Sequence, residues 1–121
     1  MAATIKDIAA MLKAETLVDH NIDREVGCVI ASDLVSDMLV CCDAGAFLIT
    51  GLANIQVVRA AEMIDLIGVV FVRNKEPATE VIEYAEEMEL PLLSTDYTMY
   101  EACGLVYDIG LRPGDFSTRE D

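Results

Sequence analysis

Basic residues are scarce in this sequence. Lysine and arginine together number 8 against 22 aspartates and glutamates, so the formal net charge is −14. A protein that binds a nucleic-acid backbone or an anionic membrane surface needs the opposite balance, which argues against both as partners. A phosphate ligand would require a local exception to this negative field. After residue 75 only Arg112 and Arg119 are basic, so we expect any anion site in the first two thirds of the chain.

Long apolar runs are also missing. Hydrophobic residues make up 54% of the 121 residues, which is enough for one globular core. No run approaches the roughly 18 residues that a membrane span requires, and residues 1–13 lack the basic start and the cleavage site of a secretory signal. The sequence therefore predicts a cytoplasmic protein with a single domain over 1–112 and a polar tail over 113–121 that frays.

The cysteines form no metal-binding or redox pattern. The four cysteines include no CxxC pair, and the only histidine, His20, stands alone in a predicted turn. We therefore interpret the cysteines as reduced thiols. The adjacent Cys41 and Cys42 allow two interpretations, packing as small hydrophobic side chains or a redox or iron–sulfur site, and the lack of any partner residue favours packing.

Catalytic signatures are absent as well. The chain contains no dinucleotide-binding, P-loop, nucleophile-elbow or zinc-protease motif, and a cysteine nucleophile would depend on His20 as its base. Asp33 and Asp96 are a conceivable metal-binding pair, but nothing in their spacing distinguishes them from helix caps. We expect no enzymatic activity, no metal and no cofactor.

What the chain does contain is a regular alternation of strand and helix patterns. Strand patterns recur about every 22 residues in the middle of the chain, which is typical of a parallel sheet. Runs such as 69–72 are apolar without alternation, as expected of strands that are covered on both faces. The predicted fold class is α/β, a three-layer sandwich with a mostly parallel sheet covered by helices on both faces. The predicted elements are strands over 26–30, 47–50, 69–72 and 92–94 and helices over 4–12, 34–42, 54–66, 79–88 and 98–107.

Two of the predicted helices have unusual faces. The helix over 79–88 carries glutamates along one side, which is typical of a solvated face and offers a docking surface for a basic protein partner. The helix over 54–66 is apolar around most of its circumference. It must be buried on more than one side, either in a central position or at a subunit interface, so a homodimer is expected.

Polar residues gather where the predicted strands end. Parallel sheets bind ligands beyond the carboxyl ends of their strands. Hydroxyls, an exposed glycine and helix N-terminal amides can hold a small anion there, with Arg73 or Lys75 offsetting the negative field. The same residue types commonly cap the helices that follow, so both interpretations remain. The candidate ligand-binding residues are Ser32, Asp33, Thr50, Gly51, Asn54, Arg73, Ser94 and Thr95.

An ordered series of short blocks resembles the DRTGG domain family, which is named for an Asp-Arg-Thr-Gly-Gly string. The corresponding string here reads DREVG, in which Asp23, Arg24 and Gly27 are retained and Glu25 and Val26 depart from the pattern. The resemblance extends over roughly 4–112. The later blocks are VIASDLVSDML over 29–39, FLITGLANI over 47–55, the strand over 68–72 before Glu76-Pro77, and LPLLSTD over 90–96.

The resemblance implies an α/β sandwich similar to the N-terminal domain of HPr kinase/phosphorylase. In larger proteins the domain is a non-catalytic module, found beside CBS domains in regulated pyrophosphatases and within some phosphate acetyltransferases, where it supports dimer contacts. Stand-alone forms are encoded near iron-only hydrogenase subunits and regulatory ATPase domains. The resemblance also transfers a site onto Asp33, Thr50, Gly51, Asn54, Ser94 and Thr95.

Two functions follow as expectations. The first is a homodimeric regulatory or protein-interaction module without catalysis, associated with an anaerobic hydrogenase or redox system. The alternative is a sensor that binds an adenine nucleotide or a simple anion such as phosphate at the carboxyl ends of the strands.

Overall fold

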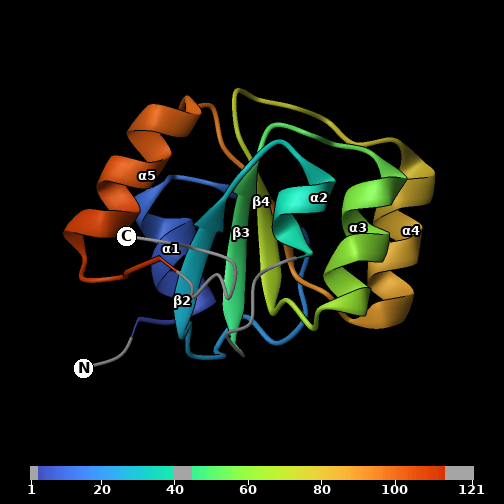
Figure 1. The fold of residues 1–121 in the computed structure, drawn as a ribbon, viewed down its shortest axis with the longest axis horizontal. Helices are drawn as coiled ribbons and strands as arrows, with labels where there is room; N and C mark the ends of the chain where they lie inside the picture. Colours follow the sequence, from blue (N-terminus) through green and yellow to red (C-terminus); the bar gives the residue numbers. More distant parts are fainter. Residues whose placement is uncertain (1–2, 40–44, 114–121) are drawn as a thin grey trace.

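From residue 28 onward strands and helices alternate along the chain, and the strands gather in one sheet (Figure 1). The structure is a computed structural model, and it describes residues 3–39 and 45–113. In chain order the elements are α1 (Ile5–Met11), β1 (Glu15–Val18), β2 (Cys28–Ala31), α2 (Val35–Met38), β3 (Ala46–Thr50), α3 (Ile55–Met63), β4 (Gly68–Phe71), α4 (Thr79–Met88), β5 (Leu92–Ser94) and α5 (Met99–Asp108).

The five strands form one sheet in the order β1-β5-β4-β3-β2. Strands β2 to β5 are parallel to one another, and β1 lies antiparallel on the edge beside β5. The predicted α/β class with a mostly parallel sheet is therefore confirmed. The strand β1 was not predicted, because the side chains of Glu15 and Thr16 are exposed and its extended shape depends on pairing with Leu93 and Ser94 of β5.

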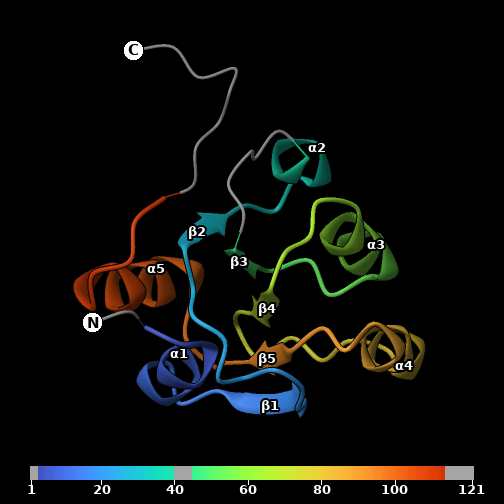
Figure 2. The same cartoon turned by 90° about the horizontal axis from the view of Figure 1, so that it is seen from below.

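Helices cover both faces of the sheet, as Figure 2 shows by looking along the strands. Helices α1 and α5 lie on one face, and α2, α3 and α4 lie on the other. Each face has its own apolar core. Phe47, Val70 and Leu93 point from the sheet toward α1 and α5, whereas Leu48 and Phe71 point toward the other layer.

The central strands have no exposed side. Every residue of β3, β4 and β5 is buried, which explains their unbroken apolar runs. Gly68 is paired with Phe47 across β3 and β4. A methyl group at Gly68 would lie 2.7 Å from Cε1 of Phe47, so the buried ring occupies the space that a side chain would need.

The helix boundaries follow from local capping. Thr4 with Asp7 and Thr98 with Glu101 form capping boxes at the starts of α1 and α5. Helix α2 ends at Met38, with Leu39 as its C-cap. The remainder of the predicted helix over 34–42, including Cys41 and Cys42, lies outside the described residues.

Helix α3 occupies a central position. It lies between α2 and α4 on its face of the sheet, and Val57, Val58, Ala60 and Ala61 are buried there. Contacts with the sheet and with two neighbouring helices account for its apolar circumference. The helix ends three residues earlier than expected, at Met63, and the chain turns. Within 3–39 and 45–113, none of the helices is both long enough and apolar enough to cross a membrane.

Candidate functional site

The carboxyl ends of the parallel strands lie at the upper edge of the sheet in Figure 1. Asp33 follows β2 and reaches the end of β3, where its Oδ1 accepts hydrogen bonds from Thr50 Oγ1 at 3.2 Å and from the Gly51 amide at 2.7 Å. Thr50 Oγ1 also accepts a hydrogen bond from the Leu52 amide. The protein's own carboxylate thus takes the amide that an anionic ligand would use.

Arg73 approaches the same point from β4. Arg73 and Asn74 both have left-handed backbone conformations, with φ of 59° and 54°. Their amides donate to the carbonyls of Tyr97 and Thr95, each at 2.8 Å, and this holds the turn in place. A methyl group added at Gly51 would lie 3.1 Å from Nη2 of Arg73 and 3.4 Å from Oδ1 of Asp33.

The sequence-predicted residues therefore divide into two groups. Asp33, Thr50, Gly51 and Arg73 come together at the ends of three neighbouring strands. Their arrangement presents a carboxylate and a guanidinium on either side of a glycine backbone. Such a pair can contact a ligand that carries both hydroxyl groups and a negative charge.

The second group serves the fold. Asn54 caps α3 by accepting from the Val57 amide, and Ser32 accepts from the Leu34 amide in a local turn. Ser94 Oγ donates to the Lys75 carbonyl at 3.2 Å. Thr95 is buried, and its Oγ1 donates to the Leu12 carbonyl at 2.6 Å, joining β5 to the end of α1.

The capping interpretation applied to Ser32, Asp33, Asn54, Thr95 and Asp96; it is correct for Asn54 and wrong for the other four. The N-cap of α2 is Leu34 rather than Asp33, and that of α5 is Thr98 rather than Thr95 or Asp96. The spacing of Thr98 and Glu101, which is that of a capping box, is a sequence signal for this N-cap and agrees with the helix predicted over 98–107. Among the described residues there is no group of three or more histidine, cysteine or acidic side chains that could hold a metal ion.

The described histidine and cysteines lie apart from this cluster. His20 Nε2 contacts Glu86 Oε1 of α4 at 2.5 Å. Cys28 is buried in β2, and Cys103 is half-buried in α5. Burial raises the pKa of the Cys103 thiol, so it carries less thiolate at neutral pH than an exposed cysteine.

The DRTGG-like string lies at the opposite end of the sheet, before β2. Its backbone groups hold the start of the chain: the Ile5 amide donates to the Arg24 carbonyl, and the Val26 amide donates to the Ala3 carbonyl. The Gly27 amide donates to the Gly45 carbonyl at 2.9 Å. These bonds give the string a role in the fold, and the Arg24 side chain lines a hollow of about 480 Å³ beside it.

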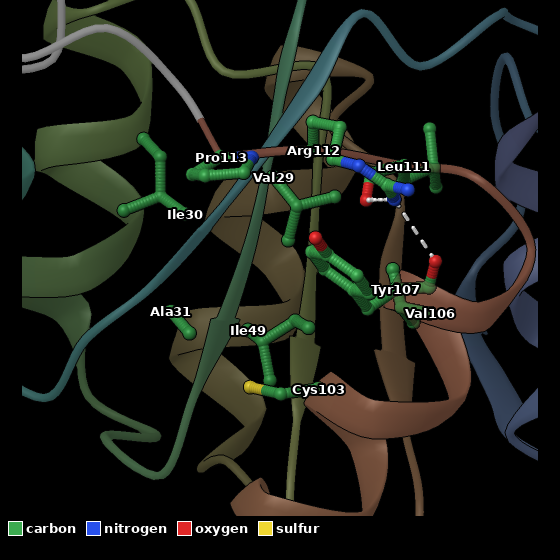
Figure 3. A pocket seen from close by; sticks show the side chains of 10 residues that line it. All are labelled: Val29, Ile30, Ala31, Ile49, Cys103, Val106, Tyr107, Leu111, Arg112 and Pro113. Atoms are coloured by element: carbon green, nitrogen blue, oxygen red, sulfur yellow. Dashed lines mark hydrogen bonds between the residues drawn. The ribbon is translucent and has the colours of Figure 1, made fainter.

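Two hollows that the sequence did not reveal lie around α5. One, of about 310 Å³, lies between β2, β3, α5 and the segment over 111–113; its apolar wall includes Val29, Ile49 and Cys103 (Figure 3). The other, of about 650 Å³, lies on the outer side of α5 between Tyr100 and Tyr107. The spacing of the tyrosines along α5 was the available sequence signal.

Among solved structures, a regulatory region that contains a DRTGG domain has a similar fold. The chain is similar to the crystal structure of the CBS and DRTGG domains of the regulatory region of Clostridium perfringens pyrophosphatase, complexed with its activator diadenosine tetraphosphate. The TM-score is 0.71 and the identity is 18%, over 85% of this chain and 45% of that chain. The present chain thus spans less than half of the regulatory region that it matches. No protein of curated function matches the sequence.

The family assignment comes from the sequence itself. The model of the DRTGG domain matches residues 7–109, which includes every described strand and nearly all of the described helices. The match covers both the candidate cluster at the carboxyl ends of the strands and the string over 23–27. The chain belongs to the DRTGG domain family.

Proposed function

We propose that this protein is a non-catalytic regulatory module that acts through protein contacts as a homodimer, with α2 and α3 at the subunit interface. The observation that carries the proposal is a group of exposed apolar side chains on these two helices. Leu34 is 59% exposed, Leu39 42% and Met63 74%. Soluble proteins bury such side chains against a partner when they form one patch.

The position of α3 supports this interface. Tyr84 of α4 donates a hydrogen bond to Glu62 at 2.6 Å, which marks the side of α3 that faces α4 and raises the pKa of Tyr84. Successive helical residues point about 100° apart, so Met63 points away from that contact. The exposed apolar side chains of α2 and α3 can therefore contact the same surface of a second subunit.

Charge also favours this surface for self-association. Two copies of a chain with a net charge of −14 repel each other, so contact is least unfavourable where the local charge is balanced. Helix α3 carries one base, Arg59, and one acid, Glu62, and α2 adds one acid, Asp37, whereas α4 carries four glutamates. The balanced helix is the one that bears Met63.

The cluster at the strand ends supports a role without catalysis. Asp33 follows β2, and it already accepts hydrogen bonds from Thr50 and Gly51 at the end of β3. In that position its Oδ1 joins two loops, which is a structural role. The partner system that we propose is the anaerobic hydrogenase or redox system implied by the family resemblance, and the partner itself is a basic protein.

The test is the oligomeric state of a charge variant at the proposed interface. Met63→Glu places a carboxylate in an apolar contact and should shift a dimer to monomer in light scattering at micromolar concentration. The matched control is Tyr100→Glu, an exposed position on the opposite helix layer, which should remain dimeric. A wild-type monomer, or a Met63→Glu variant with unchanged mass, contradicts the proposed interface.

A second candidate function is a sensor of an adenine nucleotide or phosphate at the strand ends. Arg73 and Asp33 flank Gly51, and they can contact a phosphate and a ribose hydroxyl respectively. The similar pyrophosphatase region was crystallised with diadenosine tetraphosphate. Calorimetric titration with AMP, ADP, ATP, diadenosine tetraphosphate and phosphate tests this function. Heat that disappears in Arg73→Ala supports it, and no heat with any of the five removes it.

A further inference from the structure

The outer side of α5 bears a face that the fold does not use. Tyr100, Gly104 and Tyr107 are spaced by four and three residues, so they lie in one row along the helix. Tyr100 is 90% exposed and Tyr107 is 55% exposed. The two rings border the hollow of about 650 Å³, whose floor includes Gly104. We call these three residues the tyrosine face.

Gly104 has no reason within the fold to be glycine. A methyl group at this position would meet no atom within 4 Å, and glycine inside a helix is less stable than alanine. The residue lies in the middle of the ten-residue helix α5, where no turn or close packing requires it. A local choice that weakens the helix without a compensating contact indicates a function outside the fold, here the close approach of another chain.

Arg112 shows which chemistry this face accepts. Its guanidinium lies 3.9 Å from the centre of the Tyr107 ring, and its Nη1 donates to the carbonyls of Tyr107 and Leu111. This is a cation–π contact, in which the negative face of the ring attracts the cation. In the part of the chain that the structure describes, the more exposed Tyr100 ring has no such cation over it.

The charge around the tyrosine face points the same way. The only charged residues within α5 are the acids Glu101 and Asp108, and the exposed Asp96 lies just before the helix. Glu101 lines the hollow beside Tyr100. Arg112 supplies a positive charge at Tyr107, so the negative rim lies at the Tyr100 end, where it attracts a basic segment and repels a second copy of this acidic chain.

We propose that the tyrosine face binds an arginine-bearing helix of a basic partner protein, which crosses α5 at Gly104 and stacks a guanidinium on Tyr100 as Arg112 stacks on Tyr107. The inference deepens the proposed function and rests on it, because it assigns the partner's docking surface to the layer opposite the subunit interface. The glycine lets the two helix backbones approach closely, and the acidic rim favours arginine over neutral side chains.

The test uses defined peptides and the full chain. The probe is a fluorescein-labelled, alanine-based helical peptide with arginine at every fourth position, and its counterparts carry lysine or citrulline at the same positions. Fluorescence anisotropy should show the tightest binding for the arginine peptide. Tyr100→Leu keeps an apolar side chain but removes the ring, and it should weaken binding by about 3- to 30-fold, the range of a cation–π contact. Tyr100→Phe should retain binding.

Further variants separate this surface from the proposed dimer. Gly104→Gln fills the hollow and should abolish binding of the arginine peptide while circular dichroism remains helical. Met63→Glu, on the other layer, should bind the peptide as the wild type does. Bound peptide should also slow alkylation of Cys103, which lines the hollow.

The outcomes that overturn the inference are distinct. If the arginine and lysine peptides bind with equal affinity, and Tyr100→Leu does not change that affinity, the binding is non-specific charge attraction and the inference is wrong. If the arginine peptide does not bind, the inference is also wrong. If Gly104→Gln abolishes self-association of the protein, the tyrosine face binds a second copy of this chain instead of a basic partner. Loss of the dimer in Met63→Glu with retained peptide binding leaves this inference intact, whereas a wild-type monomer that binds the arginine peptide contradicts the homodimer alone.

Discussion

Asp33 and Gly51 join the ends of two neighbouring strands through a hydrogen bond of 2.7 Å from the Gly51 amide to Oδ1 of the carboxylate. The same oxygen accepts the hydroxyl of Thr50. The bond fixes the loop before α2 against the loop before α3, so it orders the edge of the sheet that carries the candidate cluster and the starts of both helices.

Removal of the Asp33 carboxylate should therefore destabilise the protein. We expect Asp33→Ala to lower the free energy of unfolding by about 1–2 kcal/mol, because charged acceptors contribute more than neutral ones but this side chain is exposed. Asp33→Asn keeps an acceptor oxygen and should lose less. Urea denaturation measures both. Equal stability of Asp33→Ala and the wild type would mean that the carboxylate does not order the loops.

Two glycines should respond to alanine in opposite directions. Gly68→Ala forces a methyl group against the buried ring of Phe47 and should destabilise the fold by about 1–3 kcal/mol. Gly104→Ala meets no atom within 4 Å and should stabilise α5 by about 0.5–1 kcal/mol. Thermal denaturation of the pair tests this, and a loss of stability in Gly104→Ala would show that the glycine has a structural role.

The buried hydroxyl of Thr95 should contribute more than that of its neighbour. Thr95→Val preserves the shape but leaves the Leu12 carbonyl without the hydroxyl that it accepts at 2.6 Å. We expect a loss of about 1–3 kcal/mol in urea denaturation. The control Ser94→Ala breaks a longer bond to Lys75 and should lose less; the reverse order would refute this ranking.

The cysteines should react according to burial. Because burial raises the pKa of Cys103, its alkylation by iodoacetamide at pH 8 should be slower than that of an exposed thiol, and its rate should keep rising at higher pH. The folded state retains this proton more tightly than the unfolded state. Its contribution to stability is therefore complete below the ordinary thiol pKa of about 8.5 and is lost as the pH rises through the raised value.

Mass spectrometry after alkylation of the native protein locates the reacting residues. Cys28 is buried and should react only after denaturation, and Cys103→Ala should remove the slow, pH-dependent label. The same experiment separates the two interpretations of Cys41 and Cys42. Rapid labelling of either one in the native protein would favour a redox role over packing.

The fold was predictable to the extent that burial dictated residue type. Strands such as β3 and β4 are buried on both faces, so their sequences are unbroken apolar runs. The edge strand β1 has exposed residues at Glu15 and Thr16, and its conformation depends on β5, which lies about 75 residues further along the chain. The local sequence carries no comparable signal for it.

The sequence was sufficient to predict which residues belong to the candidate cluster, but not which of them contact one another. Residues that follow parallel strands must meet at one edge, which brought Asp33, Thr50 and Gly51 into consideration. Whether Asp33 caps α2 or crosses to Gly51 depends on loop geometry. The approach of Arg73 to Gly51 depends on a left-handed turn at Arg73 and Asn74, and the sequence has no glycine there to indicate such a turn. The stacking of Arg112 on Tyr107 likewise depends on the path of the chain after α5.

Sedimentation velocity of the wild-type protein at micromolar concentration is the decisive test of the proposed homodimer. We expect the main species to have twice the mass of the 13.2 kDa chain, and its fraction should increase at higher salt because screening reduces repulsion between acidic subunits. A species with the mass of one chain at every concentration and salt level would contradict the claim that the protein acts as a homodimer.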